Sequence, residues 1–280
     1  MGKQVFISYR RHRSNDVAVR IAKYLRRILP DEFVFLDTAS IPSGHDFHLV
    51  LRNAINGSDI VLVLIEPGWS ELRDASQTLR LHDPGDYVRM EVQWAIEGGK
   101  IVVPILLDGE PMPLAQQLPP EILTLCTKQA LSANSRSVEA SIDRLILEQK
   151  IGVVDYNVLV DLLRQYGQIA EWEPNLRHKA DQVKQYCNLR PYEKLAGLLD
   201  LTLTGNGKHF LAFSTAGFYH RSVGPTINGS FRALCRISKV TLDEKRSTVF
   251  IDDEGWTLLG TMEDEAYALI RRIMTLCGDS

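Results

Sequence analysis

The first half of the chain alternates short apolar runs with stretches in which apolar residues recur every three or four positions. The runs predict strands and the intervening stretches predict amphipathic helices. Strands that alternate with helices in this way are typical of an α/β domain with a doubly wound, flavodoxin-like parallel sheet. The predicted strands are Val5–Ser8, Phe33–Asp37, Ile60–Ile65, Ile101–Leu107 and a weaker one near Gln129–Ser132.

Two of these runs predict their own place in the sheet. Ile60–Ile65 is apolar on both faces, as expected of a strand buried inside a parallel sheet. Ile101–Leu107 contains Pro104, which has no backbone N–H, so we expect an edge-like or bulged strand there.

The second half has a different pattern, beginning at about Gly152. Apolar residues at helical spacing predict one helix around Val158–Tyr166 and a second that starts at Pro174 and runs through Val183. Short strands separated by turn residues follow, and Glu263–Leu276 predicts a final amphipathic helix. The predicted strands are 194–203, 210–213, 217–220, 231–242, 248–251 and 256–259.

Composition narrows the class of protein. The 280 residues suffice for two domains with real cores, and 45% hydrophobic with 24% charged residues is ordinary globular usage. A formal charge of -3 gives no global positive field for nucleic acid or anionic lipid. The four cysteines form no CxxC pair and predict buried thiols. With no apolar run near 20 residues, we expect a cytoplasmic protein without a transmembrane segment.

In a doubly wound sheet, ligands bind beyond the carboxyl ends of the strands, where the strand order reverses. This rule selects the loops after the first three strands, which contain Ser8–Arg11, Asp37–Asp46 and Glu66–Trp69. The chain has neither a Gly-x-Gly-x-x-Gly after its first strand nor a Walker A sequence, so the common nucleotide cradles are missing.

The order of several motifs resembles a TIR domain over roughly residues 1–148, most similar to those of bacterial TIR proteins. The motifs are Val5–Arg11, Phe35–Asp37 followed by Ile41–Gly44, and Asp86–Glu91 ahead of Ile101–Ile105. In that family the loop here numbered Thr38–Phe47 gates the pocket and mediates assembly. Many TIR domains hydrolyse or cyclise NAD+ with a glutamate on the helix before the fourth strand, and Glu91 occupies that position.

The chemistry makes a single carboxylate plausible. Cleavage of the nicotinamide–ribose bond releases a neutral base from a cationic pyridinium, so no general acid has to protonate the leaving group. Glu91 would stabilise the oxocarbenium-like charge, and Arg10 and Arg11 would contact the pyrophosphate. We expect no metal and no cofactor beyond NAD+ as substrate. The further candidate binding residues are Ser8, Tyr9, Phe35, Asp37, Ser43, Gly44, Trp69, Tyr87 and Trp94.

Several of these residues also have a purely structural interpretation. A helical glutamate is usually a solvated surface residue, and Phe35 and Trp94 are more often core residues than substrate contacts. The arginines can form surface ion pairs, and Asp37 can cap a turn. At the level of the whole protein, the alternative to an NAD+ hydrolase or cyclase is a TIR interaction or adaptor module without catalysis, although such domains generally lack the glutamate.

The second half contains nothing catalytic in its sequence, because its histidines lack ligand spacing. Its strands and closing helix resemble a pleckstrin-homology-like (PH-like) domain. We therefore expect a TIR domain at 1–148, a helical connector at 149–189 and a PH-like sensor or oligomerisation domain at 190–280. The resemblance further implies an anti-phage effector activated by self-association through TIR domains, with an activating ligand or protein at the C-terminal domain.

Overall fold

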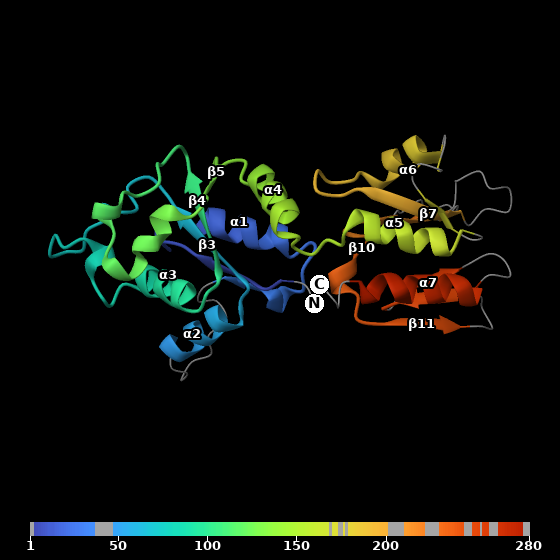
Figure 1. Cartoon of the computed structure of the whole chain (residues 1–280), viewed down its shortest axis with the longest axis horizontal. Coiled ribbons are helices and arrows are strands. Elements are labelled where there is room, and N and C mark those ends of the chain that lie inside the picture. Colours follow the sequence, from blue (N-terminus) through green and yellow to red (C-terminus); the bar gives the residue numbers. More distant parts are fainter. Residues whose placement is uncertain are drawn as a thin grey trace. The chain divides into compact units, whose positions relative to one another are not determined.

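The computed structural model describes residues 3–36, 47–167, 170–172, 176, 179–200, 210–221, 230–243, 248–252, 254–257 and 263–276. The chain divides into two compact units, and the division falls between Arg144 and Leu145 (Figure 1). In the described part of the chain, no helix is long and apolar enough to cross a membrane.

The N-terminal unit is built on a five-stranded parallel sheet with the order β2-β1-β3-β4-β5. This order confirms the predicted flavodoxin-like architecture, because the chain winds outward in both directions from β1 and β3. The strands are β1 (Val5–Ser8), β2 (Val34–Leu36), β3 (Ile60–Ile65), β4 (Ile101–Leu107) and β5 (Leu131–Ala133).

Helices cover both faces of this sheet (Figure 1). α1 (Asn15–Leu25) and α4 (Glu139–Gln149) lie side by side, and Arg20 and Tyr24 of α1 bond to Glu139 and Asp143 of α4. α2 (Phe47–Gly57) and α3 (Tyr87–Glu97) pack together against β3, with Leu51, Ile55, Val88 and Val92 in one apolar cluster. Short 3-10 turns lie at Asp31–Phe33, Arg80–His82, Ala115–Gln117 and Pro120–Thr127.

The prediction of an edge-like or bulged strand at Pro104 holds only locally: β4 is an internal strand without a bulge, but Pro104 precedes its pairing with β5. Its pairing with β3 runs without a break from Ile101 to Leu106, and Pro104 stands opposite Val63. On its other side, β4 pairs with β5 only from Ile105 to Leu107. Pro104 is therefore tolerated because β5 is too short to require a backbone donor from it.

The C-terminal unit combines two antiparallel sheets with helices. One sheet has the order β10-β9-β8-β7-β6 and the other β11-β12-β13. The strands are β6 (Ala170–Trp172), β7 (Leu195–Asp200), β8 (Phe210–Ser214), β9 (Gly217–Arg221), β10 (Ser230–Ala233), β11 (Val240–Asp243), β12 (Thr248–Ile251) and β13 (Glu254–Thr257). The predicted strand 231–242 is two strands, since the 3-10 turn Leu234–Arg236 separates β10 from β11.

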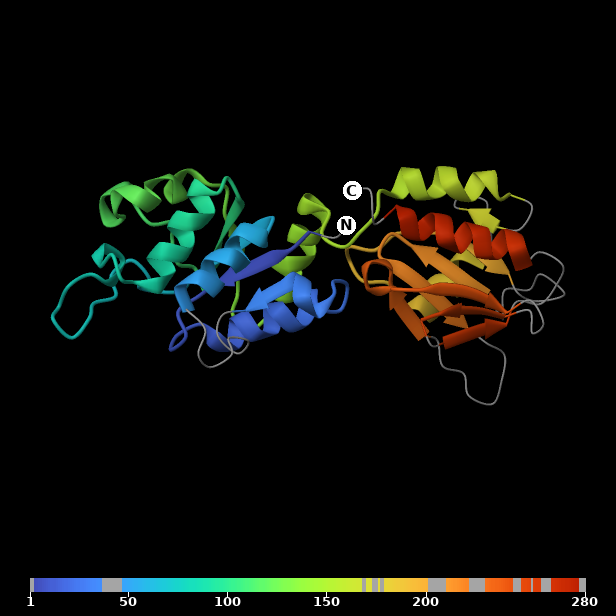
Figure 2. The same cartoon turned by 90° about the horizontal axis from the view of Figure 1, so that it is seen from below.

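The helices of this unit belong to its core. α5 (Tyr156–Gln165) and α7 (Glu263–Thr275) lie next to each other on one side of the strands (Figure 2). Their apolar faces share one cluster with β7, β8, β9 and β12. α6 (Lys179–Cys187) packs through Val183 and Cys187 onto β7 and β8. The segment predicted to connect two domains therefore contributes helices, and the strand β6, to the second unit.

Of the three cysteines that the structure describes, only Cys187 is buried. Cys126 and Cys235 are partly exposed, and all three are free thiols. The expectation of buried thiols therefore holds for Cys187 alone, whose pKa is raised to about 12, chiefly by burial.

Candidate functional site

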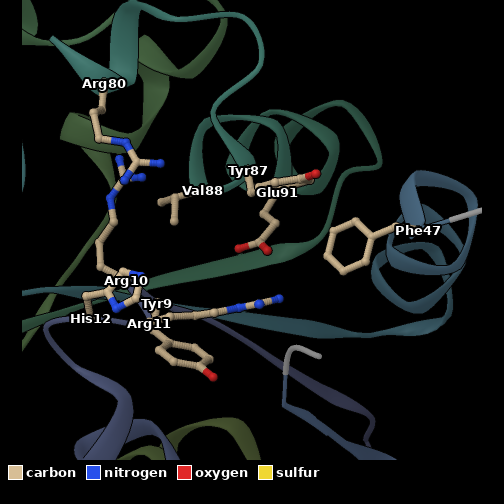
Figure 3. A pocket seen from close by; sticks show the side chains of 9 residues that line it. All are labelled: Tyr9, Arg10, Arg11, His12, Phe47, Arg80, Tyr87, Val88 and Glu91. Carbon is tan, nitrogen blue, oxygen red and sulfur yellow. The ribbon is translucent and has the colours of Figure 1, made fainter. Parts of the chain in front are cut away.

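A cavity of about 250 Å³ opens at the carboxyl end of β1, where the sheet topology predicts a site (Figure 3). The loop after β1 forms one wall, the first turns of α3 form the second, and the start of α2 forms the third. Three arginines and one glutamate line it together with aromatic side chains. The lining residues are Tyr9, Arg10, Arg11, His12, Phe47, Arg80, Tyr87, Val88 and Glu91.

Glu91 lies on α3 with its carboxylate directed into this cavity (Figure 3). Only 1% of the residue is exposed. Its Oε2 accepts a hydrogen bond of 2.5 Å from the hydroxyl of Ser8, the last residue of β1. The interpretation of Glu91 as a solvated surface residue is therefore wrong, because its carboxylate is buried, lines the cavity and accepts a hydrogen bond from a buried hydroxyl.

Asp86 organises the cationic wall of the cavity. It is the N-cap of α3, and its Oδ1 accepts from the backbone N–H of Arg89 at 3.0 Å. Its Oδ2 accepts from Arg10 Nη1 at 2.5 Å and lies 3.3 Å from Arg80 Nε. One buried aspartate thus ties the loop after β1 to the helix that carries Glu91.

Arg10 keeps hydrogen-bonding capacity after it has paired with Asp86. The residue is 5% exposed, and its buried Nε and Nη2 have no hydrogen-bond partner among the described residues. A buried guanidinium with two unused donors is costly unless an acceptor fills the site. An anionic group of a ligand would satisfy both donors in the geometry that arginine favours.

Aromatic rings form the opposite side of the cavity, toward α2. Phe47 meets Tyr87 edge to face, with 4.9 Å between ring centroids, and the Arg11 guanidinium lies 6.0 Å from the Phe47 ring. His48 lies 5.6 Å from Tyr87 on the outer side. This wall suits a planar ring, and its π faces favour a cationic one.

A further buried carboxylate, Glu66, lies outside the cavity lining. Glu66 follows β3, is 6% exposed and accepts from the Ser14 hydroxyl at 3.2 Å. Burial raises the pKa of Glu66, while its hydrogen bonds and the nearby charges of Arg10 and Arg13 oppose the rise. Glu66 does not line the cavity, so it supports the loop between β3 and α3 rather than a ligand.

The structure brings together six of the residues that the sequence singled out. Glu91, Tyr9, Arg10, Arg11 and Tyr87 line the cavity, and Ser8 contacts Glu91 from beneath. Asp37, Ser43 and Gly44 lie outside the described residues.

Three aromatic candidates do not line the cavity. Trp69 is fully buried in the apolar core, and Phe35 stacks on Phe6 with 5.2 Å between ring centroids. Trp94 packs at the edge of the same core beneath the Arg52 guanidinium, at 5.8 Å. These contacts support the structural interpretation of Phe35 and Trp94, and Trp69 is likewise a core residue.

Sequence reasoning missed several residues of the site. Phe47, His12, Arg80 and Val88 line the cavity, and Asp86 pairs with two of its three arginines. One signal was available: an aspartate directly before an apolar helical repeat is typical of an N-cap. The ion pair of Asp86 with Arg10 joins residues 76 positions apart and has no local signature.

Comparisons with known proteins agree with this architecture. The family model described as TIR domain matches residues 5–146, which is more than half of the chain. The chain therefore belongs to the TIR domain family.

Two solved structures are similar at 14% identity. One is the activated Roq1 resistosome directly recognizing the pathogen effector XopQ (TIR domains), matched over 51% of this chain and 97% of that chain with a TM-score of 0.39. The other is a metazoan TIR-STING receptor from C. gigas in complex with 2′,3′-cGAMP, matched over 99% of this chain and 84% of that chain with a TM-score of 0.34. Both TM-scores are low, so the family assignment rests on the family model.

Proposed function

We propose that this protein cleaves the bond between nicotinamide and ribose in NAD+, with Glu91 as the catalytic carboxylate. The observation that carries the proposal is the position of Glu91: a buried carboxylate in a cavity whose other walls are cationic and aromatic. The TIR family supplies the reaction class, since many of its members cleave NAD+, and the residue stands in the motif where that family has its glutamate.

The reaction breaks the bond between C1′ of the ribose and the ring nitrogen, and the electron pair stays on nicotinamide. Positive charge develops on the ribose, and Glu91 would stabilise it electrostatically in a water-poor site. Water then adds to C1′ and releases a proton, which gives ADP-ribose. Attack by a nucleophile within the same molecule gives the cyclic product, and the proposal includes both outcomes.

The remaining walls fit the other parts of NAD+. The unused Nε and Nη2 donors of Arg10 suit a pyrophosphate oxygen, and Arg80 adds positive charge on the same side. Phe47 and Tyr87 suit the cationic nicotinamide ring. In the proposed complex, the bond to be cleaved would lie between the arginines and the aromatic wall, next to Glu91.

Nicotinamide release by the purified full chain tests the proposal. Wild type, Glu91→Ala and Glu91→Gln are incubated with NAD+ at high protein concentration, and we expect both variants to lose roughly 100-fold or more of the activity. Glu97→Ala is the matched control, because Glu97 is an exposed glutamate on the same helix. Equal release by wild type and Glu91→Ala would remove Glu91 from the mechanism.

A wild type that releases no nicotinamide, even when concentrated, would support the alternative of an interaction module. Such a module should bind a partner through the loop Thr38–Phe47.

We further propose that self-association regulates this activity in an anti-phage effector. The layout of the C-terminal unit is the support for this role: the meander β7–β10, the second sheet β11–β13 and the closing helix α7 resemble the elements expected of a PH-like domain. It would sense a ligand or protein, or bring copies together. We expect specific activity to rise steeply with protein concentration. The reason is that the loop Thr38–Phe47 of one copy would complete the site of the next, and neighbouring copies raise the effective concentration of that loop.

A further inference from the structure

Ser8 stands where sequence reasoning expected a substrate contact, but its surroundings differ from that expectation. The residue is fully buried and does not line the cavity. It is the last residue of β1 and is paired with Val63 in the parallel register between β1 and β3, so its backbone is held at the carboxyl end of the strand. Its hydroxyl donates to Glu91 Oε2 at 2.5 Å, across 83 positions of sequence.

A hydroxyl that donates to a carboxylate has two physical effects. It fixes the rotamer of a long side chain, which removes conformational freedom that the reaction would otherwise have to overcome. It also favours the ionised carboxylate over the protonated acid, which opposes the cost of burial. Both effects act on Glu91, which is almost fully buried, and neither requires Ser8 to touch a substrate.

We propose that Ser8 is a positioning residue that holds the Glu91 carboxylate ionised and aimed into the cavity. The inference rests on the proposed cleavage of NAD+ and specifies how its catalytic group is supported. Donor and acceptor belong to one chain, so the carboxylate is held in place without a neighbouring copy. Self-association would then act on other parts of the site.

Ser8→Ala removes the hydroxyl and leaves the strand intact. We expect kcat to fall roughly tenfold to 100-fold while KM for NAD+ changes by less than about threefold, because the lost contact is to Glu91 rather than to substrate. The acid limb of the pH–rate profile should move to higher pH, since the ionised carboxylate loses a donor. The loss should be the same in dilute and concentrated protein.

Ser8→Cys and Ser58→Ala complete the experiment. Cysteine keeps the shape of serine but is a weak donor, so its activity should fall between those of wild type and Ser8→Ala. Ser58 is an equally buried serine of the same unit whose hydroxyl donates to the Ala54 carbonyl at 2.8 Å, outside the cavity. Its alanine variant should keep wild-type kcat and pH profile. Circular dichroism of each variant checks the fold.

Wild-type kcat and pH profile in Ser8→Ala, or in Ser8→Cys if the alanine variant does not fold, would overturn the role of Ser8. A rise in KM without loss of kcat would restore Ser8 as a substrate contact. Both results are read against Glu91→Ala. If that variant is as active as wild type, the proposed function fails; if it is inactive while both Ser8 variants behave as wild type, only the inference about Ser8 fails.

Discussion

Each unit buries a glutamate against the hydroxyl of a serine that ends a β-strand. In the N-terminal unit, Ser8 of β1 donates to Glu91 at 2.5 Å. In the C-terminal unit, Ser214 of β8 donates to Glu193 at 3.0 Å, and Glu193 also accepts from Tyr219 at 2.6 Å. Burial and hydrogen bonding are thus alike at the two sites.

The surroundings of the two carboxylates differ. Glu91 lines a cavity, whereas Glu193 lies among its own donors and 3.6 Å from Arg190 Nη1, whose guanidinium is stacked against Phe231. The cavity of about 490 Å³ between β11 and α7 is lined by other residues: Ser238, Lys239, Val240, Tyr267, Arg271, Met274 and Thr275. A buried carboxylate therefore indicates a reactive site only where a cavity lets a substrate reach it.

The largest expected effect comes from the same substitution at both sites. Glu91→Gln should reduce nicotinamide release to about 1% of the wild-type rate or less, because a neutral amide cannot stabilise the developing positive charge. Glu193→Gln should keep release within about twofold when both are assayed at the same protein concentration. An inactive Glu193→Gln variant that remains folded would show that Glu193 and the residues bonded to it also control catalysis.

An arginine of each site extends the comparison: Arg10 lines the cavity of Glu91, and Arg190 lies near Glu193. Arg10 retains two nitrogens, Nε and Nη2, without a hydrogen-bond partner among the described residues, whereas Arg190 donates to the Tyr192 hydroxyl at 2.9 Å. Arg10→Lys keeps the charge beside Asp86 but loses the planar fork, so we expect KM for NAD+ to rise roughly tenfold. Initial rates over a series of NAD+ concentrations measure this. Arg190→Lys should leave KM unchanged, and a KM that does not respond to Arg10→Lys would contradict the anion site.

The pH dependence of stability should reveal Glu193. Burial raises its pKa above the ordinary 4.5, so the unfolded chain releases this proton at lower pH than the folded chain does. Its contribution to the free energy of unfolding is therefore complete below about pH 4.5 and decreases as pH rises through the raised value. Glu193→Gln has no ionisable group here and does not lose stability in this way. Thermal unfolding from pH 5 to 8 should therefore show the melting temperature of the variant rising relative to that of wild type. Parallel pH curves would contradict the raised pKa.

The smallest effect concerns two aspartates of the described residues, each of which caps a helix. Asp86 caps α3 beside the cavity, and Asp155 caps α5, accepting from the backbone N–H groups of Asn157 and Val158 at 2.9 and 3.3 Å. These bonds lower the pKa of Asp155. Its contribution to the free energy of unfolding is therefore present above about pH 3.8 and is lost as pH falls through the lowered pKa.

Asp155→Ala should cost about 1 kcal/mol of stability and leave kcat unchanged, as measured by denaturant unfolding beside an activity assay. Asp155→Asn should recover most of the loss, because asparagine also caps helices well. An alanine variant as stable as wild type at neutral pH would show that the cap contributes nothing.

The sequence by itself determined the elements of the first unit and the position of its central residue. Short apolar runs predicted β1, β3 and β4, and helical spacing predicted α3 with Glu91 on it. These signals are local, since a strand or an amphipathic helix is specified by the period of its own residues. The strands of the second unit were harder to predict, because β6 is only three residues long and the turn Leu234–Arg236 is flanked by strand-forming residues on both sides.

Only the tertiary structure decided which residues surround Glu91. Trp69, Trp94 and Phe35 are aromatic residues near the loops that topology selects, and their chemistry could not distinguish a core position from a cavity wall. The contacts of Ser8 with Glu91 and of Arg10 with Asp86 join residues 83 and 76 positions apart. Such pairs depend on how the strands order themselves in the sheet, which is a property of the packed unit and leaves no periodicity in the chain.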